Sequence, residues 1–214
     1  DVYKRQGTIC TTAAFADPWN ESERQAIYAA REGAAQLVAA HERKWAELWQ
    51  GDIEIEGDPT AQLDVRFALF NLYGSIREGS RRSIPPMGLS ARGFYNGHIF
   101  WDSEIWMYPV LLVLRPCLAR QMLDYRTDGL DAARRRAYAH GYRGPMFPWE
   151  GDDRGEEATP TFALTGPLEH HITADIAIAS WNYYCVTQDR EWLRREGFPL
   201  MREAARFWCD RVTA

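Results

Sequence analysis

The sequence lacks several features that would assign it to whole classes of protein. No apolar run approaches the roughly 18 residues that a membrane-spanning helix needs, because the longest, Val110 to Leu114, is far too short. Basic residues do not predominate, since 25 Lys and Arg face 30 Asp and Glu, for a net charge of -5. Such a chain has no basic field to attract phosphates, so neither a membrane nor nucleic acid is expected as a partner.

Cysteine is also scarce and widely spaced. The 4 cysteines stand far apart, and none forms the two-residue spacing of a zinc knuckle or a redox motif. We interpret them as buried thiols. The sequence therefore predicts no metal site and no cofactor built on cysteine.

What the chain has in quantity is apolar and aromatic residues, 46% and 13% of the total, which is enough for a substantial core. Apolar residues recur at three- and four-residue steps and predict helices over 21–50, 60–74, 103–114, 117–125, 129–140, 172–187 and 199–212. Asn20 is the expected N-cap of the first helix and Gly33 its expected bend. The expected buried side of the second helix consists of Leu63, Phe67, Phe70 and either Leu72 or Tyr73. Only residues 2–12 have the composition of a strand.

Two long loops, residues 79–102 and 141–171, join these helices. Loops of this length in a compact helical protein are usually functional or disordered. Both are rich in aromatic rings, carboxylates and amides, so disorder is not expected. Rings that stack on C–H faces and carboxylates that accept from hydroxyls are typical of a surface that binds sugars.

The most informative stretch runs from Tyr95 to Glu104. A simple alternative is a helix start, with Asp102 or Ser103 as the N-cap and Glu104 favoured by the helix dipole. A cap does not require Asn96, His98 and Trp101 beside it, whereas recognition of a polyol requires several fixed donors and acceptors.

A second candidate is the pair Trp149-Glu150. The acidic residues that follow, Asp152 and Asp153, are interpreted as a solvated loop. Further on, His170 and His171 are adjacent, so their side chains point to different faces of a helix and a shared metal ion is not expected.

The stretches 88–104, 142–150 and 171–184 resemble family 65 of the glycoside hydrolases, and the similarity runs in order along nearly the whole chain. The resemblance implies a mainly α fold in which residues 1–12 end a β-sandwich, residues 13–59 form a helical linker, and residues 60–214 begin an incomplete (α/α)6 barrel. It also implies a pocket for the non-reducing glucose, in which Asp102 holds the sugar hydroxyls. The residues implied to line that pocket are Tyr95, His98, Trp101, Asp102, Glu104, Trp149 and Glu150.

The family includes inverting hydrolases and phosphorylases that act on α-glucosides such as kojibiose and trehalose. The resemblance implies that the general acid and the base lie beyond Ala214, so that the chain is a fragment, and it implies no cofactor. Trp149-Glu150 stands where the phosphorylases tend to carry Trp-Arg, which favours a hydrolase with a disaccharide or oligosaccharide substrate. A phosphorylase that uses inorganic phosphate and a non-catalytic sugar-binding fragment remain as alternatives, and a homodimer of the full-length protein is also expected to be possible.

Overall fold

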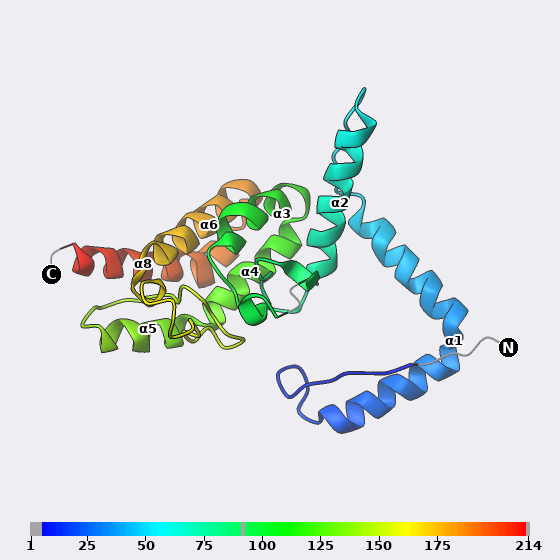
Figure 1. Cartoon of the computed structure of the whole chain (residues 1–214), viewed down its shortest axis with the longest axis horizontal. Coiled ribbons are helices and arrows are strands. Elements are labelled where there is room, and N and C mark those ends of the chain that lie inside the picture. Colours follow the sequence, from blue (N-terminus) through cyan, green and yellow to red (C-terminus); the bar gives the residue numbers. More distant parts are fainter. Residues whose placement is uncertain (1–5, 91–92, 213–214) are drawn as a thin grey trace. The chain divides into compact units, whose positions relative to one another are not determined.

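The computed structural model describes residues 6–90 and 93–212 and divides the chain into two units, residues 1–50 and 51–214 (Figure 1). Helices dominate both units, which confirms the prediction of a mainly α fold. Among the described residues, no helix is long and apolar enough to cross a membrane.

The first unit consists of a loop and one long helix, α1 (Pro18–Leu48). Gly33 has φ 77° and ψ 160°, so it interrupts the helix as predicted. The predicted cap was wrong, because the side chain of Asp17 accepts from the backbone N–H of Asn20 and therefore caps the helix one residue before Pro18. Within residues 6–12 the structure has no strand, and the assignment to a β-sandwich stays a prediction.

The second unit begins with α2 (Pro59–Ser75), which Asp58 caps by accepting from the amides of Thr60 and Ala61. Its predicted buried side was wrong for Leu63 and Phe67, which are 68% and 67% exposed, whereas Tyr73 is buried as one of the predicted alternatives, together with Leu69. Both apolar sets recur at helical spacing, so the pattern alone does not say which one meets a neighbouring element.

The remaining helices carry the core of the second unit. They are α3 (Tyr108–Leu114), α4 (Pro116–Asp128), α5 (Leu130–Ala139), α6 (His171–Thr187), α7 (Arg190–Trp192) and α8 (Phe198–Arg211). The short helices η1 (Gly88–Ser90), η2 (Tyr95–Gly97) and η4 (Gly166–Leu168) interrupt the two long loops. The periodicity predicted all the longer helices but not α7, which Asp189 caps through the N–H of Trp192.

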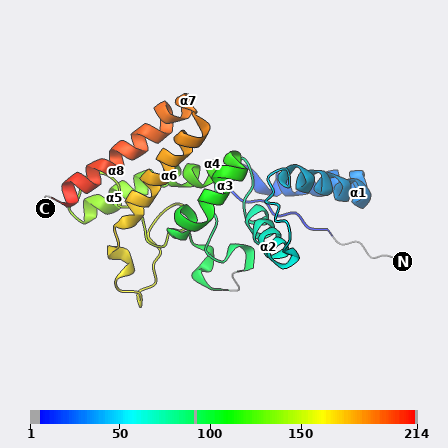
Figure 2. The ribbon, with the colours of Figure 1, turned by 90° about the horizontal axis from the view of Figure 1, so that it is seen from above.

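Helix α6 lies at the centre of this packing. It contacts α3, α4 and α8, and the views in Figures 1 and 2 show these helices side by side. A buried cluster of Ala133, Phe147, Ile172, Ile176 and Leu200 joins α5, α6 and α8 to the second loop. The helices therefore hold the second loop, residues 141–171, by its apolar side chains.

Two turns of π-helix interrupt the regular geometry, η3 (Ser103–Met107) and η5 (Leu193–Gly197). In each, the following residue donates its N–H five positions back, Tyr108 to Ser103 and Phe198 to Leu193. A proline comes next in both cases, Pro109 and Pro199. Since proline has no N–H and its ring clashes with the carbonyl four residues earlier, a wider turn before it avoids that clash.

The interpretation of the four cysteines as buried thiols was wrong. Cys10 and Cys117 are partly exposed, and Cys185 and Cys209 are exposed.

Candidate functional site

The two long loops meet at one pair of residues. Ile99 and Gly151 form an antiparallel bridge in which each N–H donates to the other's carbonyl at 2.8 Å. A Cβ on Gly151 would stand 2.7 Å from the Tyr125 hydroxyl oxygen, so only glycine allows this approach. The bridge brings the stretch around Trp101 and the pair Trp149-Glu150 to one place.

Asp102 presents its carboxylate without a partner of its own in the part of the chain that the structure describes. It precedes η3 but makes no capping hydrogen bond, and it is only partly buried. Ser103 is no cap either, because its hydroxyl donates to the carbonyl of Ile84 at 2.7 Å. The alternative interpretation of this segment as a capped helix start is therefore wrong, and the Asp102 carboxylate is available to a ligand.

Two half-buried tryptophans flank this region. Trp101 packs edge-on against His171, with ring centroids 5.1 Å apart, and Trp149 packs edge-on against Phe100 at the same separation. Phe100 is itself buried and also contacts Tyr95. The rings therefore brace one another in fixed orientations, as a stacking surface requires.

Gly166→Ala tests how Trp149 is held. A Cβ at Gly166 would approach the Trp149 ring to 2.4 Å, too close to be accommodated unless the indole moves. We expect this substitution to shift the tryptophan fluorescence and to lower the free energy of unfolding by about 1–3 kcal/mol. The matched control is Gly7→Ala, because a Cβ at Gly7 would meet no atom within 4 Å and its backbone does not lie in the left-handed region. An unchanged emission spectrum in Gly166→Ala would contradict this account of Trp149.

Glu150 is buried and held from two sides. One carboxylate oxygen lies 2.8 Å from Nδ1 of His98, across the junction of the two loops. Its backbone N–H and that of Trp149 donate to the carboxylate of Glu157, which also pairs with Arg136 at 2.7 Å. The pair His98–Glu150 is thus fixed by a chain of polar contacts that ends on α5.

Glu104 occupies a different place from the one the resemblance implies. Both of its carboxylate oxygens accept from the Arg126 guanidinium at 2.8 Å, and both side chains are fully buried. Arg126 also donates to the carbonyl of Phe100 at 3.1 Å. Glu104 therefore positions the backbone before Trp101 and Asp102, and its implied direct contact with a sugar finds no support in the structure.

Tyr95 packs edge-on against Phe100 and is nearly half exposed. It and Asn96 both have positive φ, 54° and 51°, which is uncommon for residues other than glycine. Strained backbone of this kind often marks a binding segment.

His171 was not among the predicted site residues, yet it lies against Trp101. Its Nδ1 is 2.7 Å from Asp175 and its Nε2 is 3.1 Å from Glu169. His170 packs instead against Tyr142 and Phe207, so the adjacent histidines do face different neighbours. The i, i+4 spacing of His171 and Asp175 could have indicated their pairing, whereas nothing local connects Arg126 with Glu104.

Comparison with known proteins adds the family context. The family description "Glycosyl hydrolase family 65 central catalytic domain" matches residues 66–214. A kojibiose hydrolase from Mucilaginibacter mallensis is 51% identical over 98% of this chain and 31% of its own length. A kojibiose phosphorylase from Halothermothrix orenii is 43% identical over 83% of this chain and 24% of its own.

A solved structure of a protein from the human microbiome superposes with a TM-score of 0.82 at 22% identity, covering 92% of this chain and 26% of that one. This likeness supports the expected fold, part of an (α/α)6 barrel. The chain spans about a third of the length of the kojibiose hydrolases it matches.

Proposed function

Because the chain belongs to family 65 of the glycoside hydrolases, we propose that it contributes the glucose-binding part of an inverting hydrolase that releases glucose from kojibiose- or trehalose-like α-glucosides. The observation that carries the proposal is the unpaired carboxylate of Asp102, which follows the braced ring of Trp101 in a segment that the Ile99–Gly151 bridge joins to the segment of Trp149. Hydrolysis is preferred over phosphorolysis because the identity to kojibiose hydrolases, 51% and 52%, exceeds the 41% to 44% found for several phosphorylases.

In this proposal the site binds by stacking and by hydroxyl recognition. The indole of Trp101 or Trp149 lies against the apolar face of the glucose ring. Asp102 accepts hydrogen bonds from two sugar hydroxyls, and these bonds are strong because the acceptor is charged. Tyr95 closes the outer end, and the pair His98–Glu150 supplies further fixed polar atoms.

In this proposal Glu104 acts indirectly, by positioning other residues of the site. Its ion pair with Arg126 fixes the Phe100 carbonyl, and so the direction in which Trp101 and Asp102 leave the backbone. Positioning of this kind matters because a misplacement of about 1 Å can cost two orders of magnitude in rate.

The reacting groups belong to the rest of the proposed protein. An inverting hydrolase needs a carboxylic acid to protonate the glycosidic oxygen and a carboxylate to activate water, roughly 6.5–9.5 Å apart. We assign neither role to a residue of this chain. The proposal also keeps residues 1–12 as the end of a β-sandwich, 13–59 as a linker and 60–214 as the start of the barrel, in a protein that can form a homodimer.

The test of the reaction type is glucose release by the full-length protein from kojibiose and from trehalose, with and without inorganic phosphate. We expect free glucose at the same rate in both conditions, since water is the proposed nucleophile. The control is maltose, which reports on linkage preference with the same detection.

Phosphorolysis is the second candidate, favoured by the phosphorylases that match at 41% to 44% identity. Glucose 1-phosphate that forms only when phosphate is present would replace the hydrolase proposal with this one. Sugar binding without any reaction would favour the third candidate, a non-catalytic sugar-binding protein.

A further inference from the structure

His171 begins α6 and lies between two carboxylates. Its Nδ1 is 2.7 Å from a carboxylate oxygen of Asp175, one turn further along α6, and its Nε2 is 3.1 Å from a carboxylate oxygen of Glu169, just before the helix. The ring also packs edge-on against Trp101, with centroids 5.1 Å apart and an angle of 87° between the planes. Trp101 belongs to the proposed glucose site, whereas the three polar side chains have no assigned role in it.

The two carboxylate contacts together decide the protonation state of the His171 ring. An ionised carboxylate accepts hydrogen bonds and donates none, and a neutral imidazole carries only one N–H. A neutral His171 would therefore present a lone pair to one of the carboxylate oxygens at hydrogen-bonding distance. Both contacts are satisfied together only when both ring nitrogens are protonated, so the geometry requires an imidazolium ion.

Among the described residues, Glu169 and Asp175 are the only groups that form ion pairs with the His171 ring. Asp175 also interacts electrostatically with the buried guanidinium of Arg126 on α4, so this carboxylate is held from two sides. The other charged or titratable groups near the start of α6 are Asp102 in the first loop and the pair that His170 forms with Arg211 at the end of α8.

The indole of Trp101 is supported by the start of α6. It is only partly buried, packs against the buried cluster that contains Ile172, and meets the ring of His171 edge-on. Trp106, which also contacts the indole, is 62% exposed and so is itself held less firmly. A change in the orientation of the His171 ring therefore changes the support of the indole.

We propose that His171 is a positioning residue of the glucose site, and that it fixes the Trp101 indole only as an imidazolium ion held between Glu169 and Asp175. When the pH rises and the ring loses a proton, one carboxylate faces a lone pair, the ring turns away and the indole loses its support. Sugar affinity therefore falls as the pH rises through the titration of His171. This inference rests on the proposed glucose site, but not on the reaction that follows binding.

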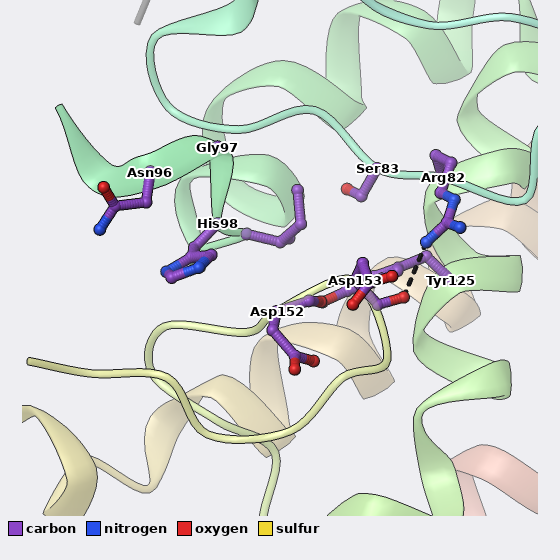
Figure 3. A pocket seen from close by; sticks show the side chains of 9 residues that line it. Arg82, Ser83, Asn96, Gly97, His98, Tyr125, Asp152 and Asp153 are labelled. Atoms are coloured by element: carbon purple, nitrogen blue, oxygen red, sulfur yellow. Dashed lines mark hydrogen bonds between the residues drawn. The ribbon is translucent and has the colours of Figure 1, made fainter. Parts of the chain in front are cut away.

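His98, another histidine of the site, shows the contrast. Its Nδ1 lies 2.8 Å from Glu150, and it lines a hollow of about 380 Å³ together with Arg82 and Asp153 (Figure 3). One carboxylate needs one N–H, which a neutral imidazole supplies when its proton is on Nδ1. His98 therefore keeps this contact when it is neutral, whereas His171 needs two protons to keep both of its contacts.

The test is calorimetric titration of the full-length protein with glucose at a series of pH values from about 5 to 8, the range in which histidine titrates. We expect the affinity to fall about fivefold over this range, the effect of one lost hydrogen bond. In His171→Gln the affinity should be weaker and should lose this pH step. The matched control is His41→Gln, since His41 also packs edge-on against a tryptophan, Trp45, but lies on α1.

Glu169→Gln separates the proton requirement from a role in packing alone. A glutamine amide can accept from the protonated Nε2 of His171 and, after the amide turns over, donate to the deprotonated Nε2. We therefore expect the glucose affinity of this variant to stay at its low-pH value over the whole range. A pH step in Glu169→Gln equal to that of the parent would overturn the inference.

Tryptophan emission gives a readout that needs no sugar. In the ligand-free protein the emission should change with pH as His171 loses its proton. This change should vanish in His171→Gln and in Trp101→Phe, and it should persist in His41→Gln. The melting temperature of His171→Gln should stay close to that of the parent, because the His171 side chain is 42% exposed and exposed ion pairs contribute little stability.

The two measurements distinguish a failure of this inference from a failure of the proposed function. Glucose affinity that is the same at every pH, or tryptophan emission without the pH step, would overturn the role of His171 even if the protein hydrolyses kojibiose. Absence of glucose binding at every pH would instead overturn the proposed glucose site, and the emission step would still decide whether His171 holds Trp101.

Discussion

Asp102→Asn is expected to lower kcat/KM for kojibiose by about 10²- to 10³-fold in the full-length protein. The substitution keeps the shape of the side chain but removes its charge and one acceptor oxygen. Each hydrogen bond to a charged acceptor contributes about 1.5–3 kcal/mol, and two such bonds are proposed. Steady-state glucose release over a range of kojibiose concentrations measures the effect.

The stability of this variant is expected to stay close to that of the parent. Among the described residues, the Asp102 carboxylate makes no hydrogen bond or ion pair that the substitution could break. The matched control is Asp131→Asn, because Asp131 lies on the surface of α5 with its side chain 80% exposed and, within residues 6–90 and 93–212, pairs only with Arg134. Unchanged turnover in Asp102→Asn would remove Asp102 from the glucose site.

Arg126→Met is expected to lower the free energy of unfolding by about 3–5 kcal/mol. Methionine fills a similar volume but leaves the Glu104 carboxylate buried without its counterion, and an uncompensated buried charge is strongly destabilising. Denaturant-induced unfolding, followed by far-ultraviolet circular dichroism, gives the free energy. Activity should also fall, since the Phe100 carbonyl loses a donor.

The double variant Glu104→Leu/Arg126→Met separates the cost of lost packing from the cost of an unpaired buried charge. Because it removes both charges together, most of the lost stability should return. Activity should return less completely, because the Phe100 carbonyl still lacks its donor. Equal destabilisation of the single and double variants would mean that packing, and not the unpaired charge, sets the cost.

Local patterns in the sequence were sufficient to predict the longer helices and to single out the two loops that form the candidate site. Apolar spacing predicted α4, α5, α6 and α8 because each buries a stripe of side chains. The composition of the two loops indicated a binding surface, and the structure brings those loops together at Ile99 and Gly151. The cap of α1 could also have been predicted, since a proline at the first helical position points to Asp17 just before it, but Asn20 was predicted instead.

Contacts between distant residues were not readable. Nothing around Glu104 shows that a guanidinium 22 positions later will enclose it. The exposed side of α2 depends in the same way on which neighbours are present, so Phe67 appeared equivalent to Leu69.

The π-turn η3 also determines the direction in which the Asp102 side chain leaves the backbone. Successive α-helical residues are rotated by about 100°, since 3.6 residues make one turn. A π-turn holds one residue more than the α-helical turn it replaces. The residues before η3, including Asp102, are therefore rotated about the helix axis by roughly one residue's step relative to α3. In a family 65 chain with one residue fewer between this aspartate and the proline at the start of α3, the aspartate side chain would point in a different direction. A sequence alignment that places a gap between this aspartate and the proline would therefore match carboxylates that do not occupy the same place in the site.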